Sequence, residues 1–141
     1  MKNDNSTKQS NASKPMLANR LLKFRFWQPS TKTMQKWEDY QQYGIFEMFN
    51  NIDSIPLLFT GFNDKKGIEI YQGDICKYHK NTSKWLVSYH FEVKFKNGAF
   101  YAYWEREMMG KLEQHWDLLS QKDMRNIRVV SNVFQSTQAT S

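Results

Sequence analysis

The stretch WLVSYHFEVKFKNGAFYAYW, residues 85–104, decides the fold. Along its first half, apolar and polar residues alternate, which is the period of a β-strand with one buried face. The dipeptide Asn97-Gly98 then favours a tight type I′ turn, after which AFYAYW returns antiparallel. The stretch therefore predicts a long β-hairpin, and its inner face would carry Trp85, Val87, Tyr89, Phe91, Val93 and Phe95.

Upstream of the hairpin, short apolar runs predict strands at residues 55–60, 68–71 and 75–79. Glycine and aspartate stand between them, where glycine can adopt a positive φ and aspartate can accept backbone N–H groups. A phosphate-binding loop would instead need its glycines in one loop, followed by Lys-Ser or Lys-Thr at the start of a helix. We therefore interpret these residues as turns: Gly61, Asp64, Gly67, Gly73 and Asp74, with Asn97 and Gly98 of the hairpin.

The remaining segments complete a mainly β protein. Alternation predicts a strand at residues 20–27, NIRVVSNVF predicts a last strand at 126–134, and residues 34–51 are mixed enough for a strand or a short helix. Between 104 and 119 the apolar residues recur every three or four positions, which fits one face of a helix. Gly110 weakens that prediction, and a strand stays the alternative. The expected fold is a small barrel or strongly bent antiparallel sheet with one short helical segment.

Charge and composition divide the chain of 141 residues. Residues 1–36 carry eight Lys or Arg and one acidic residue, which gives a net charge of +7. Residues 37–141 carry twelve Lys or Arg and thirteen acidic residues, which gives −1. Residues 1–19 hold too few apolar side chains to offset the entropy of ordering. We expect a disordered basic tail at 1–19, one β domain at 20–135, and a polar tail at 136–141.

Several kinds of site are not supported by the residues present. Cys76 and His79 have the spacing of half a zinc site, but positions three apart on a strand point to opposite faces, and no second pair accompanies them. The single Cys76 excludes an internal disulfide and is expected to be a small buried apolar residue. The acids at 105, 107, 113 and 117 are expected on a solvated face. We predict no catalytic residue, metal or cofactor.

The chain is expected in the cytoplasm. Nothing near its start resembles a secretion signal, and no apolar run approaches the roughly 20 residues that cross a bilayer. We therefore expect no contact with a membrane.

Three separated stretches resemble the YopX-like family of phage and prophage proteins: LKFRFWQPSTKTM at 22–34, LLFTGFNDKKGIEIYQGDI at 57–75 and IRVVSNVFQ at 127–135. The middle stretch is similar to the family pattern QFTGLKDKNGKEIYEGDIV. The resemblance implies a phage-encoded accessory protein with an SH3-like barrel core, and it brings no catalytic mechanism. Ser131 stands where the family usually has glycine, and QSTQATS replaces the family ending ENPEL.

A basic and aromatic group near the start is the candidate binding site, because it lies on the polar face of the predicted strand or just after it. Such residues can hold phosphates and stack a base, or form a protein-binding rim, and both readings stay open. We expect a non-enzymatic module that contacts a host or phage protein in the bacterial cytoplasm, for example as an inhibitor of a defence nuclease. The alternative is nucleic-acid binding through residues 1–36, and self-association is left open. The candidate binding residues are Lys23, Arg25, Trp27, Lys32 and Lys36.

Overall fold

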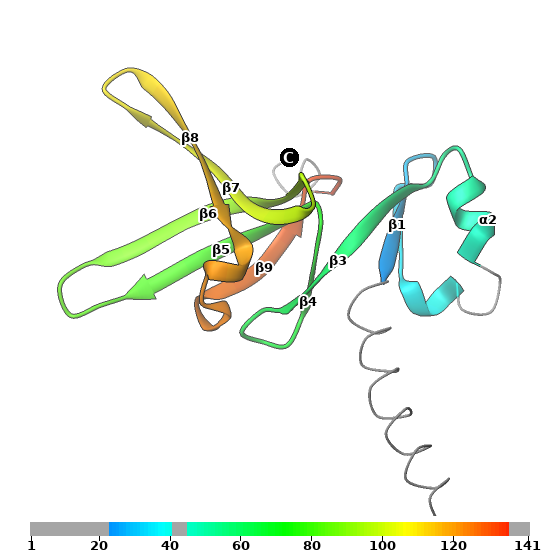
Figure 1. Ribbon diagram of the computed structural model, residues 1–141, viewed down its shortest axis with the longest axis horizontal. Helices are drawn as coiled ribbons and strands as arrows, with labels where there is room; N and C mark the ends of the chain where they lie inside the picture. The colour runs from blue at the N-terminus through cyan, green and yellow to red at the C-terminus, as the bar shows by residue number, and fades with distance from the viewer. Residues whose placement is uncertain (1–22, 41–44, 136–141) are drawn as a thin grey trace, which may run out of the picture.

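The computed structural model describes residues 23–40 and 45–135. The predicted disordered tail, residues 1–19, and the polar tail, residues 136–141, lie outside the described residues. The described part contains two antiparallel sheets, one of four strands and one of five (Figure 1). This architecture confirms the prediction of a mainly β protein.

The four-stranded sheet has the order β2-β1-β3-β4 and lies at the N-terminal side. Two short helical segments, η1 and α2, fall in the stretch whose pattern was mixed. Phe49 of α2 packs edge-on against Phe24 and Phe26 of β1, with ring centroids 5.0 and 5.3 Å apart. The elements are β1 (Phe24–Gln28), β2 (Thr33–Gln35), η1 (Trp37–Tyr40), α2 (Ile45–Asn50), β3 (Ile55–Asn63) and β4 (Glu69–Tyr71).

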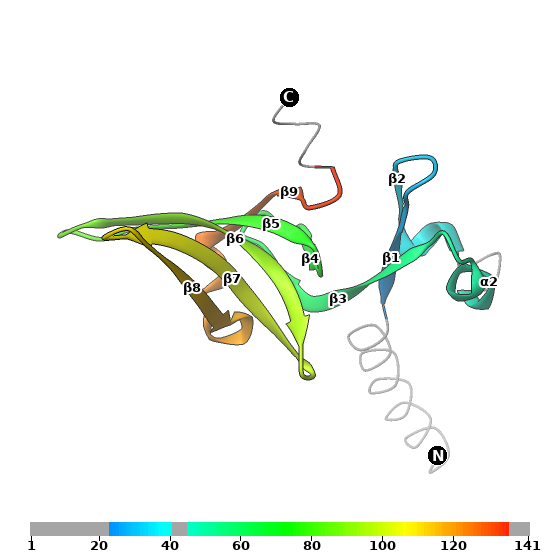
Figure 2. The same cartoon turned by 90° about the horizontal axis from the view of Figure 1, so that it is seen from above.

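The five-stranded sheet has the order β8-β7-β6-β5-β9 and curls strongly, as Figure 2 shows. Its inner face holds the core, and Ile70 of β4 completes it. The strongly bent sheet expected from the sequence is confirmed. Its elements are β5 (Asp74–Asn81), β6 (Leu86–Lys96), β7 (Ala99–Met108), β8 (Lys111–Leu118), η2 (Leu119–Gln121), η3 (Met124–Asn126) and β9 (Ile127–Asn132).

The predicted apolar face of β6 points inward only along its middle. Phe91 and Val93 are buried, opposite Cys76 of β5 and Ala102 of β7 respectively. Trp85, just before β6, is 63% exposed and Phe95, near its end, is 42% exposed, because the 11-residue strand is longer than the core it crosses. The alternation therefore identified the inner face correctly but overestimated how much of it is covered.

The helix predicted over residues 104–119 is wrong. β7 pairs with the whole of β8, from Tyr101 opposite Leu118 to Met108 opposite Lys111. The apolar residues do not share one face: Trp104 stacks on Tyr89, whose strand neighbour Phe91 lies in the core, whereas Trp116 packs on the other side of the sheet. Their spacing of four is a coincidence of two strands that meet at a tight turn.

β3 also differs from its predicted bounds. It continues to Asn63, so Gly61 lies inside the strand and not in a turn after it. Gly61 has φ 87°, and the pairing with β4 shifts register between Phe59 and Asn63. The glycine therefore supplies the backbone conformation of a bulge, which only glycine adopts without strain.

Candidate functional site

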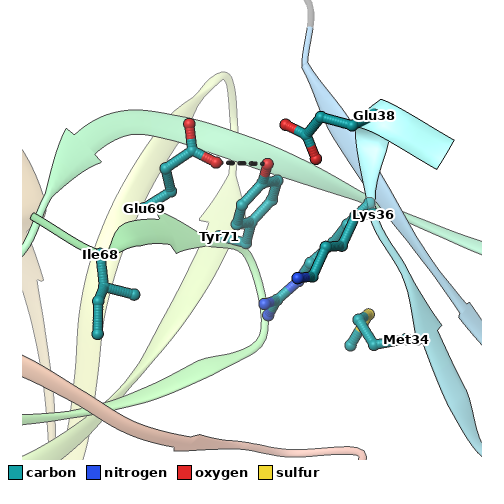
Figure 3. A pocket seen from close by; sticks show the side chains of 7 residues that line it. Met34, Lys36, Glu38, Ile68, Glu69 and Tyr71 are labelled. Atoms are coloured by element: carbon teal, nitrogen blue, oxygen red, sulfur yellow. Dashed lines mark hydrogen bonds between the residues drawn. The ribbon is translucent and has the colours of Figure 1, made fainter. Parts of the chain in front are cut away.

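A pocket of about 350 Å³ lies on the four-stranded sheet, between residues of β1, β2 and η1 on one side and the segment that carries β4 on the other. Figure 3 shows Met34, Lys36 and Glu38 facing side chains carried by the segment that forms β4. Two of the predicted binding residues, Arg25 and Lys36, line this pocket. The complete lining is Arg25, Met34, Lys36, Glu38, Ile68, Glu69 and Tyr71.

Arg25 is held by a buried carboxylate at the base of β5. Its Nη2 donates a hydrogen bond of 2.5 Å to Oδ1 of Asp74, which is 1% exposed. Oδ2 of Asp74 accepts from the backbone N–H of Tyr71 at 2.8 Å. Burial raises the pKa of Asp74, and the charge of Arg25 offsets only part of this effect. Asp74, predicted as a turn residue, therefore also connects β1 to the five-stranded sheet.

The predicted residues Trp27 of β1 and Lys23, just before it, are also engaged within the fold. Trp27 is 6% exposed and stacks on Phe134, with centroids 5.5 Å apart. Lys23 forms an ion pair with Glu69. The expectation of an exposed polar face is therefore wrong for Arg25 and Trp27, because the N-terminal sheet packs against the residues around β5 and β9. Of the predicted group, only two members are exposed, and these are Lys32 and Lys36.

The pocket itself carries both signs of charge. The hydroxyl of Tyr71 donates to Oε1 of Glu69 at 3.1 Å, as the dashed line in Figure 3 shows. Burial raises the pKa of Tyr71 well above its usual range, and the charge of Glu69 raises it further. Tyr71 is thus a neutral donor at physiological pH. This set of groups can bind a polar segment of another molecule.

The residues that could support other chemistry lie apart or are buried. Within residues 23–40 and 45–135, no three His, Cys, Asp or Glu side chains gather in a way that could hold a metal ion. Cys76 is fully buried in the core, as predicted, and burial raises the pKa of its thiol far above the usual value. No helix of the described chain is both long enough and apolar enough to span a membrane.

Asp64 organises the turn between β3 and β4. Its Oδ1 accepts from the backbone N–H groups of Lys66 and Ile68 at 2.8 and 2.9 Å, and its Oδ2 accepts from that of Val129 at 2.9 Å. Burial acts to raise the pKa of Asp64, but these hydrogen bonds outweigh it and lower the pKa. Asp64 therefore ties the turn to β9. Gly67 and Gly73 both have positive φ in the neighbouring bends.

The sequence reasoning missed an exposed apolar group at the end of the β7–β8 hairpin. Met108 is 43% exposed, Met109 99% and Leu112 62%. In Figures 1 and 2 this end projects from the sheet on the side away from β1 and β2. The signal that identifies it is Gly110, because glycine can adopt the positive φ of a tight turn. The helical interpretation of residues 104–119 concealed this signal.

Comparisons with known proteins agree with this fold. The profile of the family described as YopX protein matches residues 16–138. The crystal structure of protein EF1440 from Enterococcus faecalis is similar at 17% sequence identity and a TM-score of 0.51, covering 86% of this chain and 99% of that one. No curated protein sequence gave a significant match. The family match spans most of the chain, which therefore belongs to the YopX protein family.

Proposed function

We propose that the protein is a non-enzymatic binding module that contacts another protein through the end of its β7–β8 hairpin. The observation that carries this proposal is the exposure of three apolar side chains there: Met108, Met109 and Leu112. Soluble proteins seldom leave large apolar side chains clustered in water without a binding role. Methionine also adapts its shape to a partner, which suits a contact surface.

The arrangement of these side chains favours insertion into a partner. Met108 lies opposite Lys111, and Leu112 lies opposite Glu107, so the register places the two apolar residues on opposite faces of the hairpin. Met109 stands at the turn between them. Because apolar groups cover both faces and the tip, folding the hairpin back onto its own sheet would leave part of the group in water. A groove on another protein could cover all three.

The conformation of Met109 supports the same proposal. Its φ is 54°, a region that costs a non-glycine residue about 1–2 kcal/mol. Asparagine, which the chain uses at the equivalent position of the β6–β7 turn, tolerates this conformation better. A contact made by the methionine side chain would account for its presence at a position where folding alone favours asparagine.

Family membership suggests where such a contact would act. The resemblance to phage and prophage proteins favours a phage-encoded accessory protein in the bacterial cytoplasm. Its partner would then be a host or phage protein, and blocking the surface of a host machine such as a defence nuclease is one such role. The support for this class of partner is the family context.

The alternative, nucleic-acid binding through residues 1–36, remains a prediction. Most of that segment lies outside the described residues. Of its described cations, Lys23 and Arg25 are engaged with Glu69 and Asp74, which leaves Lys32 and Lys36 exposed. The charges closest to the fold are therefore less accessible to phosphates than the sequence suggested.

A capture experiment with matched variants tests the proposed protein contact. The tagged full chain is incubated with nuclease-treated bacterial lysate containing phage proteins, and captured proteins are quantified by mass spectrometry. Met109→Asn with Leu112→Thr removes the apolar end while keeping residues suited to a turn and a strand. The matched control is Gln114→Thr, at an exposed position further along β8.

We expect one protein to be captured by the wild-type chain and by the control, and to be reduced about tenfold or more by the double variant, as for a binding hot spot. The purified pair should show the same difference in calorimetry. A partner that is retained equally by all three chains, or the absence of any reproducible partner, would contradict the proposal.

A further inference from the structure

An aromatic group covers the face of the five-stranded sheet that points away from the core. Tyr103 lies opposite Trp116 of β8 and opposite Glu92 of β6, which places all three on the same face. The rings of Tyr103 and Trp116 have centroids 4.5 Å apart, and Tyr101 meets Trp116 edge-on at 5.9 Å. Trp116 is 38% exposed. These rings therefore form a surface platform and not part of the core.

Two lysines lie over the faces of these rings in cation-π contacts, which a stacking base would have to share or displace. The Nζ of Lys94 lies 4.6 Å from the ring centroid of Tyr103, and the Nζ of Lys96 lies 4.5 Å from that of Trp116. Lys94 also approaches Glu92 at 3.9 Å, whereas Lys96 has no ion pair with a described residue. We call Lys94, Lys96, Tyr101, Tyr103 and Trp116 the aromatic platform.

A basic row crosses the same face at its other end. Arg128 of β9 lies directly opposite Lys77 of β5, which in turn lies opposite His90 of β6. Lys77 and Arg128 line a hollow of about 120 Å³, together with Lys65 and His79. Lys65, Lys77 and Arg128 form no ion pair with a described residue. Like charges directly opposite each other destabilise a sheet, so this arrangement is better explained by an anionic ligand than by folding.

The register shows that the platform and the basic row belong to one surface. On β6, His90, Glu92 and Lys94 alternate onto the same side of the strand. Lys77 and Tyr101 are two strands apart in the sheet order and four residues apart along β6. Strand spacing and rise place them about 17 Å from each other. An extended polymer with a negative backbone could contact both.

We propose that this outer face of the five-stranded sheet binds single-stranded nucleic acid. Bases would stack on Tyr103 and Trp116, and phosphates would contact Lys96, Lys77 and Arg128. Aromatic rings interleaved with cations are the arrangement that binds single strands with little sequence preference. An acidic peptide would pair with the cations, but its carboxylates would not stack on the aromatic rings as bases do. The site is separate from the hairpin end of the proposed protein contact.

Fluorescence anisotropy with a labelled single-stranded oligothymidine tests the stacking part of the proposal on the full chain. Trp116→Leu keeps an apolar side chain on the sheet but removes the ring, and it should weaken binding about tenfold or more. Trp85→Leu is the matched control, because Trp85 is 63% exposed yet lies outside the platform; it should change affinity less than about twofold. Thermal melting checks that each variant is folded.

The salt dependence tests the phosphate contacts. Each phosphate contact on a single strand contributes about −0.7 to the slope of log affinity against log salt, so Lys77→Gln with Arg128→Gln should flatten it by about 1.4. The control Lys111→Gln, at the end of the β7–β8 hairpin, should leave the slope unchanged. The variant Met109→Asn with Leu112→Thr should bind the oligonucleotide with wild-type affinity.

Failure of the wild-type chain to bind the oligonucleotide would overturn the proposal. Unchanged affinity in both the Trp116→Leu variant and the Lys77→Gln with Arg128→Gln variant would also overturn it, since the contact would then lie elsewhere, for example in residues 1–22. Equal competition by polyglutamate and by unlabelled oligothymidine would show attraction to charge alone, and would also overturn it.

Discussion

Two hairpins of the same sheet turn with nearly the same backbone but with different residues. In the β6–β7 turn, Asn97 and Gly98 have φ 51° and 81°; in the β7–β8 turn, Met109 and Gly110 have φ 54° and 78°. Positive φ at both central residues defines a type I′ turn, for which asparagine and glycine are favoured. The comparison shows that a turn with positive φ at both central residues forms with glycine second and a residue other than asparagine first. The first residue determines how favourable the turn is, and it can be chosen for another purpose.

The two hairpins also differ in what supports them. The middle of β6 and β7 contributes Phe91, Val93 and Ala102 to the core. In the β7–β8 hairpin, residues 105–112 are all exposed, and none of them belongs to the core. Its end is therefore held by backbone pairing, with little contribution from packing. This difference leads to predictions that can be ordered by the size of the expected effect.

The largest effect should come from Phe91→Ala. Phe91 is 2% exposed, so truncation removes a buried ring and leaves a cavity, which costs about 3–5 kcal/mol of unfolding free energy. Leu112→Ala removes a mostly exposed side chain and should cost less than about 1 kcal/mol. Chemical denaturation monitored by circular dichroism measures both. Similar losses at the two positions would show that the hairpin end is packed and not exposed.

Asp64→Asn should have the next largest effect. The turn between β3 and β4 is held by the side chain of Asp64, whereas the two hairpin turns rely on a pair of residues with positive φ. An asparagine NH₂ group would face a backbone N–H group, so we expect a loss of about 2–3 kcal/mol at pH 7. The folded-state pKa of Asp64 is lowered below the unfolded value of about 3.9. Its contribution is thus complete above about pH 5 and is lost as the pH falls through the folded pKa.

Denaturation midpoints of wild type and Asp64→Asn at pH 7, 5 and 3 check this sign. The difference between the two chains should be constant from pH 7 to 5 and smaller at pH 3. A difference that grows toward low pH would mean that the carboxyl group is protonated in the folded protein. Asp53→Asn, at an exposed aspartate, is the matched control and should change stability little at any of these pH values.

Much of the fold could be predicted because its signals are local. The alternation along β6, the Asn97-Gly98 turn and the glycines near β4 each specify backbone conformation over a few residues. The β7–β8 hairpin could not be assigned in the same way. Its apolar residues recur at intervals that suit a helix, and a methionine occupies the position that usually identifies the turn. β7 is a strand because it pairs with β6, and β8 is a strand because it pairs with β7. These pairings join residues that are distant in the sequence, so a local pattern does not reveal them.

The candidate site was harder to predict than the fold, because burial depends on contacts between distant segments. Arg25 was expected in solvent, but its partner Asp74 lies 49 positions away. Trp27 was expected at an exposed rim, but Phe134 covers it from the far end of the chain. The alternation of apolar and polar residues in β1 predicts one buried face, but it does not reveal that other segments cover the second face as well. The outer platform formed by Tyr103 and Trp116 likewise requires the register of β7 with β8.

A smaller effect is expected from Asn97→Ala in the β6–β7 turn. Alanine tolerates positive φ less well than asparagine, so the variant should lose about 1 kcal/mol of unfolding free energy. The same measurement on Gly98→Ala should give a comparable or larger loss, because φ there is 81°. An unchanged stability in both variants would mean that the turn relaxes to another type, and the comparison between the two hairpins would then fail.

The smallest effect, and the only one expected to stabilise the fold, is that of Met109→Asn. The substitution gives the β7–β8 turn the dipeptide of the β6–β7 turn, and asparagine relieves part of the cost of φ 54°. We expect a gain of about 0.5–1 kcal/mol, visible as a melting temperature several degrees higher. Met109→Val is the opposing control, since a β-branched residue at positive φ should lower the melting temperature. If Met109→Asn instead lowered it while Met109→Val did not, the methionine side chain would have to be packed within the protein. A more stable chain that binds its protein partner less well would separate what folding requires at this turn from what binding requires.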